Sequence, residues 1–520
     1  MTLSTTTERV AWRKRILLLG TILVLHVYSM WAFGATFWYD SAHYLQFGFA
    51  LMTRHGLTTF YDGPNYYIFQ HLMPGLPLLL AATIRFFGRY GWLALTAMQH
   101  LVATCALLYF TNSYCHWLPL GWRLITIILI CVHPYYMAFH NAPMTESLAG
   151  SLLLIGLGAA LRLSGGGRVS KHTLLVLAGS GILAVQFRSY AALMVLGVLL
   201  VLFLFAASGT ARIRMAYAGL AVAASLLFFP AYRWAVTGAF FMPNIDYVTL
   251  SIALGINPRP TDDAIRRLKE LPLPSNMSAE RISANGLTFQ EAASVGAHLR
   301  SLDYSDRSAR TIVKRMAWIV RTDSRGVIAN QARLALFSVG AEHLALAGKQ
   351  GDDLFYRGYT VEDFRRHVRY YLDWFSWTLF ADYGPIFGQF FDMFGKTPET
   401  IDEHVRQELK RFLGPFFVTR EPALRDPLRL LRVPFEMWIG GWLIGVILWS
   451  RKKRPIALIL VLPVALNYVV SVSAPVGDLR YSQSLLPLYI AGSIWFLADA
   501  TVWLRTHVED RRWISGKGAA

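Results

Sequence analysis

Charged residues are scarce in this chain of 520 amino acids. They make up 16% of it, whereas hydrophobic residues make up 54%, and the mean hydropathy is +0.38. Soluble domains carry about 25% charged residues, so much of the surface of this chain is suited to lipid rather than to water. This composition favours a membrane protein that crosses the bilayer several times.

Cysteine is scarcer still, and its scarcity excludes one class of protein. Three cysteines in 520 residues cannot hold together a secreted disulfide scaffold. An aromatic content of 14% excludes a disordered chain as well. The formal charge of +18 leaves nucleic acid open as a partner until the positions of the basic residues are known.

Long apolar runs dominate the sequence. A helix needs about 20 apolar residues to cross the bilayer, and the run 16–35 has that length. We interpret it as a first span rather than a cleaved signal peptide, because it is long and many runs follow it. These are centred on 91–111, 123–139, 147–163, 173–187, 189–207, 215–237, 435–450, 456–473 and 483–503. The sequence therefore predicts an all-α polytopic membrane protein with about ten transmembrane helices.

The run 72–87 is shorter, and the positive-inside rule decides whether it spans. If it lies at the interface, 18 Lys and Arg residues fall on the inner side and six fall outside in the short loops. A spanning helix would instead put nine inside and 15 outside. The first arrangement obeys the rule, so both termini are expected in the cytoplasm. The positive charge then follows from topology, and we expect no nucleic-acid partner.

The spans divide the chain into three parts. Residues 1–237 are expected to form a seven-span module with an external first loop at 37–90, and 435–520 to add three spans and a cytoplasmic tail. Between them, 238–434 holds 26 basic and 23 acidic residues, a near balance that is typical of a folded external domain. Helical patterns such as 262–271 predict that this domain is mostly α.

One part of the external domain is ambiguous. The aromatic stretch 370–394 is interpreted as an amphipathic segment that rests on the bilayer. A hairpin of two further spans there would leave the topology of the rest unchanged.

Carboxylates outside 238–434 are few, and most of them share one side of the membrane. Nine occur there, and none is expected in the middle of the bilayer, where transporters place the ionisable groups of proton and ion relays. This argues against a secondary transporter. Five carboxylates are expected at the external side: Asp40, Asp62, Glu146, Glu436 and Asp478.

Other polar residues are expected beside these carboxylates. Each has an ordinary structural interpretation: Asp40 could end a helix in water, Glu146 could stabilise a helix start, and Arg188 could reach the lipid headgroups. Taken together on one face, they favour a site. Its further candidates are Tyr44, Gln70, His71, Arg480 and Tyr481.

This grouping suits one kind of chemistry. A carboxylate can take the proton of an attacking hydroxyl, and arginines can hold a departing phosphate through charge-assisted hydrogen bonds. At a membrane interface the natural phosphate-linked donor is anchored in lipid. The apolar helices can supply a groove for its tail.

Short motifs in this order resemble the GT-C superfamily of integral-membrane glycosyltransferases, including the branch of protein O-mannosyltransferases and aminoarabinose transferases. Asp40 follows the first span, a Pro-Gly-x-Pro start at 74–77 opens a juxtamembrane helix, and Thr145-Glu146 opens a later span. Arg188 lies alone between two spans, and Arg480-Tyr481 opens the last one. The resemblance covers about 10–237 well and 435–503 loosely.

The resemblance implies roles for these residues. Asp40 would be the catalytic base, Glu146 would orient the acceptor or the sugar, and Arg188 and Arg480, with His71, would hold the donor phosphate. Tyr44, Asp62, Gln70, Asp478 and Tyr481 would contact substrate. The chain departs from the family where Ser41 follows Asp40 in place of a second acid, and where His71 begins a segment that is Lys-Pro-Pro in the aminoarabinose branch.

We expect no resident metal and no other cofactor. His133 and His140 lie on one expected helix without an acidic partner at the spacing of a zinc site. Some branches of the GT-C superfamily do bind a divalent cation, and the external carboxylates could hold one. No nucleophile elbow and no phosphate-binding glycine loop occur in the sequence.

The sequence and the resemblance together predict a glycosyltransferase of the bacterial inner membrane, with its active site on the periplasmic side. It would move one sugar from a polyprenyl-phosphate donor to an acceptor glycan, lipid or protein, with inversion. Two alternatives stay open: a transporter of lipids or glycans, and a ligase that moves an oligosaccharide from a diphosphate carrier.

Overall fold

The computed structural model is mostly helical in the residues that it describes, and these contain no strand. The described residues are 2–33, 44, 48, 73–114, 118–164, 170–206, 208–237, 262–285, scattered positions between 294 and 319, 435–450, 454–473 and 485–516. The expected amphipathic stretch 370–394 lies outside them, as does most of the external domain.

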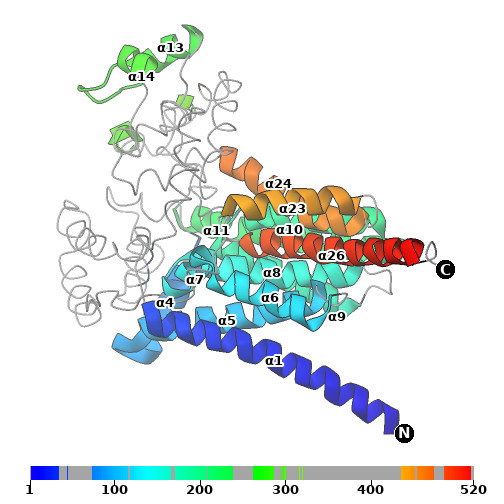
Figure 1. The fold of residues 1–520 in the computed structure, drawn as a ribbon. Helices are drawn as coiled ribbons and strands as arrows, with labels where there is room; N and C mark the ends of the chain where they lie inside the picture. Colours follow the sequence, from blue (N-terminus) through cyan, green and yellow to red (C-terminus); the bar gives the residue numbers. More distant parts are fainter. Residues whose placement is uncertain are drawn as a thin grey trace.

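Two groups of apolar helices form a bundle (Figure 1). The N-terminal group contains α1 (Thr2–Phe33), α4 (Gly75–Phe87), α5 (Gly91–Tyr114), α6 (Leu120–Val132), α7 (Pro134–Asn141), α8 (Thr145–Ser164), α9 (Lys171–Phe187), α10 (Ala191–Phe205) and α11 (Gly209–Thr237). The C-terminal group contains α23 (Phe435–Ser450), α24 (Arg454–Ser473) and α26 (Leu486–Gly516). Helix α24 packs on α10 and α8, and α26 packs on α6, so the two groups share one apolar core.

Some of these helices are long and apolar enough to cross a membrane. Among the described residues, Leu93–Ser113, Thr145–Ser164 and Gly209–Ala231 meet both conditions. Seven shorter apolar helices accompany them: Gly75–Phe87, Leu120–Val132, Lys171–Phe187, Ala191–Phe205, Trp438–Leu448, Pro455–Asn467 and Leu486–Val502. The chain is thus consistent with a membrane protein, while the total of ten spans and the orientation of the termini stay predictions.

Helix α8 lies at the centre of the N-terminal group, against α5 and α9 (Figure 1). Small residues make this close packing feasible, as they do in other membrane bundles. A Cβ added at Gly158 would lie 2.9 Å from the Tyr109 ring on α5. At α9, a Cβ on Gly181 would lie 2.7 Å from Val195 on α10. Glycine therefore sets the distances between the helices that carry the polar groups described below.

The apolar run 123–139 does not form one continuous helix, which corrects the expectation that His133 and His140 lie on one helix. Helix α6 ends at Val132, His133 is extended (φ −71°, ψ 125°), and α7 begins at Pro134. Proline has no N–H for a helix interior but fits the first position of a new helix, so the chain restarts there. His133 and His140 are consequently not on one continuous helix.

Two short helices belong to the segment between the two groups. They are α13 (Asp262–Lys269) and α14 (Ala279–Asn285), and they pack on each other. Lys269 Nζ lies 2.7 Å from Glu280 Oε1 and links them. Helix α13 lies within the segment 262–271, where the sequence predicted a helix.

Candidate functional site

The first turn of α8 carries a buried acid. Thr145 and Glu146 begin the helix, and 1% and 3% of their surfaces are exposed. Unpaired N–H groups and the helix dipole make this end of a helix favourable for a negative charge. Burial of a carboxylate nevertheless needs a partner of opposite charge.

Arg188 is that partner. It caps the C-terminal end of α9 in an extended conformation (φ −145°, ψ 115°), and α9 ends beside the start of α8. Its Nη2 donates to Glu146 Oε1, and its Nε donates to Thr145 Oγ1 over 2.8 Å. Only 11% of the Arg188 side chain is exposed. The arginine is therefore held in place by the bundle rather than extended toward lipid headgroups.

Tyr44 completes this group, which we call the Glu146 cluster (Tyr44, Thr145, Glu146 and Arg188). The Tyr44 hydroxyl lies 3.2 Å from Thr145 Oγ1, and Thr145 Oγ1 donates to Glu146 Oε2 over 3.2 Å. A threonine hydroxyl has one hydrogen to donate, so it accepts from Arg188 and from Tyr44. Thr145 thereby connects residue 44 of the expected first loop to both α8 and α9.

The Glu146 cluster contains three of the residues predicted from the sequence, namely Tyr44, Glu146 and Arg188. Their chemical roles are not tested by this proximity. The other predicted site residues lie outside the described part of the chain: Asp40, Asp62, Gln70, His71, Asp478, Arg480 and Tyr481.

A second polar group was missed by the sequence analysis. We call it the histidine cluster; it contains His26 of α1, His100 of α5, and Tyr136, His140 and Asn141 of α7. His26 Nδ1 lies 2.7 Å from His100 Nδ1, and His100 Nε2 lies 2.9 Å from Asn141 Oδ1. All five side chains are buried, with at most 7% of each residue exposed.

Ring contacts hold the histidine cluster together. The three imidazole rings lie with centroids 5.0 to 5.8 Å apart. The Tyr136 ring meets His140 edge-on at 4.5 Å and His26 at 6.0 Å. His140 Nδ1 lies 2.7 Å from the hydroxyl of Ser147, the residue after Glu146. The two clusters therefore meet at the first turn of α8.

This finding corrects the expectation that the bundle lacks ionisable groups. That expectation counted carboxylates and overlooked histidines inside the apolar runs. The available signal was a histidine in two of the apolar runs, His26 in 16–35 and His100 in 91–111, and a third, His140, directly after the run 123–139. Their burial in one cluster depends on how each helix is rotated about its axis, which hydropathy alone does not specify.

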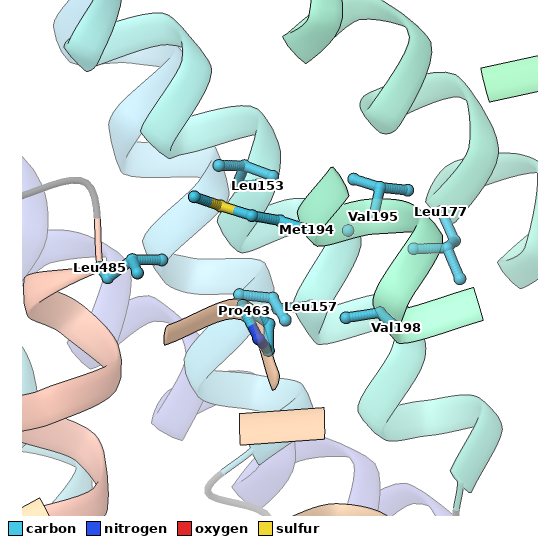
Figure 2. A pocket seen from close by; sticks show the side chains of 9 residues that line it. Leu153, Leu157, Leu177, Met194, Val195, Val198, Pro463 and Leu485 are labelled. Carbon is cyan, nitrogen blue, oxygen red and sulfur yellow. The ribbon is translucent and has the colours of Figure 1, made fainter. Parts of the chain in front are cut away.

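An apolar pocket lies deeper among the helices, where α8, α9, α10 and α24 meet (Figure 2). Leu153, Met194 and Pro463 are among the side chains that line it, and its whole lining is apolar. Pro463 lies inside α24, where it cannot donate to the helix ladder. The cavity measures only about 10 Å³, room for about one water molecule, so it is a small gap in the packing and not a groove for a lipid tail.

No group of three His, Cys, Asp or Glu residues in the described part of the chain has the arrangement of a metal site.

Comparison of the sequence with protein-family models and with curated proteins finds no match. The two clusters are therefore the basis for the proposed function.

Proposed function

We propose that the chain is a membrane glycosyltransferase that moves a single sugar from a polyprenyl-phosphate donor to an acceptor hydroxyl of a glycan, lipid or protein. The observation that carries this proposal is the Glu146 cluster, in which a buried carboxylate and an arginine are held together at the ends of two helices. The proposal also places the protein in a bacterial inner membrane, with this end of the bundle on the periplasmic side.

The Tyr44 contact supports a role for Asp40. Asp40 stands only four positions before Tyr44 in the sequence. Tyr44 is itself hydrogen-bonded to Thr145. We therefore propose that the Asp40 carboxylate acts beside Glu146 and Arg188.

The proposed mechanism is a direct displacement. Asp40 removes the proton of the acceptor hydroxyl, whose oxygen attacks the anomeric carbon of the sugar, and the bond to the lipid phosphate breaks with inversion. Arg188 and Arg480 stabilise the charge on the departing phosphate. Glu146 orients Arg188. The apolar surface of the helices accepts the lipid tail.

The test is sugar transfer in native membranes from a panel of radiolabelled polyprenyl-phosphate sugars, with a diphosphate-linked oligosaccharide added to the panel. Wild type should transfer from a monophosphate donor, and Asp40→Asn should lose that transfer while it still binds the donor. Asp262→Asn is the matched control, because it removes one exposed carboxylate from α13. Full activity of Asp40→Asn would remove Asp40 from the mechanism.

A second candidate function is a transporter of lipids or glycans. The histidine cluster and the break between α6 and α7 favour it, since transporters use ionisable groups and interrupted helices inside the bundle. Purified protein in proteoliposomes distinguishes the two functions. A transporter would move a fluorescent lipid-linked sugar between leaflets without altering it, whereas the glycosyltransferase would release the lipid phosphate as a new product.

A further inference from the structure

Asn141 determines where the hydrogens of the histidine cluster lie. Its Nδ2 is 3.2 Å from the carbonyl oxygen of Met137 and 2.7 Å from Ser29 Oγ. A carbonyl oxygen only accepts, so the amide nitrogen must face Met137 and the amide oxygen must face His100. His100 Nε2 therefore carries a hydrogen and donates it to Asn141 Oδ1 over 2.9 Å.

This assignment propagates to His26. A neutral imidazole has one N–H, so His100 Nδ1 is an acceptor. His26 Nδ1, which lies 2.7 Å from it, must then be the donor. The remaining nitrogen of His26, Nε2, is left with a lone pair, and it has no hydrogen-bond partner among the described residues. His26 is only 2% exposed, so water at the surface does not satisfy this nitrogen.

We infer that the His26–His100 pair is a proton-binding and proton-transfer site inside the bundle, with His26 Nε2 as the atom that receives the proton. Protonation there forms a new N–H bond and leaves the Nδ1–H of His26 directed at His100. The hydrogen bond between the rings becomes charge-assisted and stronger. A proton added to His100 Nδ1 would instead make that N–H face the Nδ1–H of His26, and two donors would oppose each other.

The same pair can pass the charge on. When the Nδ1–H bond of His26 breaks and an Nδ1–H bond forms on His100, the positive charge moves to His100 and His26 becomes neutral with its hydrogen on Nε2. His100 keeps its Nε2–H on Asn141. One proton enters and one shifts, with no change in oxidation state. A lasting charge in an apolar bundle is costly, so the pair suits a proton in transit.

Further polar groups lie near the His26–His100 pair, on α7 and at the start of α8. On α7, the Tyr136 hydroxyl and His140 Nε2 are both buried and also have no partner among the described residues. Across His140, the Ser147 hydroxyl connects to the first turn of α8, where Glu146 is already paired with Arg188. The titratable groups around the pair are thus Tyr136 and His140 of α7, Cys131 of α6 and, at the edge, Glu146 of α8. The His140 ring contacts both rings of the pair, and its Nδ1 lies 2.7 Å from the hydroxyl of Ser147.

The experiment is nitrogen-15 NMR of the full-length protein in nanodiscs, with labelled histidine. Near neutral pH, His26 should carry its hydrogen on Nδ1 and His100 on Nε2, and a coupling should connect the two Nδ1 atoms. Acidification should add one proton that the two rings share, and the titration should belong to the pair. His26→Gln and His100→Gln should each abolish this uptake, whereas His172→Gln, at an exposed position on α9, should leave it intact.

Several outcomes would overturn the inference. One is that both rings carry their hydrogen on the same type of nitrogen. Another is that the pair stays neutral until the protein unfolds, as a purely structural cluster would. A third is a stoichiometric metal ion on the purified protein that replaces the hydrogen between the rings. The tautomers are read from wild type, so the test survives a variant that fails to fold. It needs no sugar donor, and its result is independent of the proposed function.

Discussion

The two polar clusters of the bundle meet at one turn of α8, but their buried polar atoms are paired in different ways. The Glu146 cluster carries full charges, and the carboxylate, the guanidinium and the Thr145 hydroxyl bond one another. The histidine cluster is neutral, and three of its polar atoms lack partners among the described residues. A buried charge must be paired, whereas a neutral imidazole can leave a nitrogen open for a proton.

The largest effect is expected when the charged cluster loses one partner. Arg188→Met leaves Glu146 buried and unpaired, so it should lower the free energy of unfolding by about 3–5 kcal/mol. Adding Glu146→Gln should recover part of this loss, because the unpaired charge is then gone. Unfolding in mixed detergent micelles measures both variants.

The control for this experiment is an exposed pair. Arg266 on α13 bonds Asp263, but 71% of its side chain is exposed. Arg266→Met should therefore change stability little, since water screens such pairs. Equal effects of Arg188→Met and Arg266→Met would show that Arg188 is hydrated and that the contrast between buried and exposed charge is wrong.

Within the neutral cluster, the two paired histidines should differ. His100→Leu leaves both Asn141 Oδ1 and His26 Nδ1 without a partner. Because one such buried group costs about 1–3 kcal/mol, the loss should reach about 2 kcal/mol or more. His26→Leu orphans only His100 Nδ1 and removes a nitrogen that had no partner, so it should cost less. Equal losses in thermal unfolding would contradict the assigned hydrogens, and His172→Leu serves as the exposed control.

The packing of α4 against the end of α9 supports the Glu146 cluster, and it can also be weakened. A Cβ added at Gly75, the first residue of α4, would lie 2.6 Å from the Gln186 carbonyl oxygen and 3.2 Å from the Phe187 ring. Gly75→Ala should push α4 away from the end of α9 that holds Arg188, with a cost of about 1–3 kcal/mol. Gly179→Ala on α9 meets nothing within 4 Å and should be neutral or slightly stabilising. If Gly179→Ala lowers stability more than Gly75→Ala does, the close contact between Gly75 and Gln186 is contradicted.

The contrast between the clusters also explains what the sequence could predict. Glu146, Arg188 and Tyr44 lie near the ends of apolar runs, and helix ends in a bundle meet at a common level, so their proximity follows from topology. His26 and His100 lie inside two runs and His140 directly follows a third, and their meeting depends on rotations about the helix axes. Pro134 did mark the break between α6 and α7, but hydropathy averages over a single proline and predicted one helix.

The smallest effect concerns the ion pairs of α13 and α14, which are screened by solvent. Hydrogen bonds from Arg266 and then Arg267 hold the pKa of Asp263 below its ordinary value of 3.8, and a hydrogen bond from Lys269 holds the pKa of Glu280 below 4.5. A carboxyl whose pKa is lower in the folded state contributes stability above its unfolded pKa and loses it as the pH falls through the folded value. The packing of α13 on α14 should therefore be complete above about pH 4.5 and loosen slightly below it. Amide hydrogen exchange of these helices measures this, and Lys269→Met should remove the part due to Glu280. Loosening that begins near neutral pH would show that groups other than these carboxylates hold the two helices together.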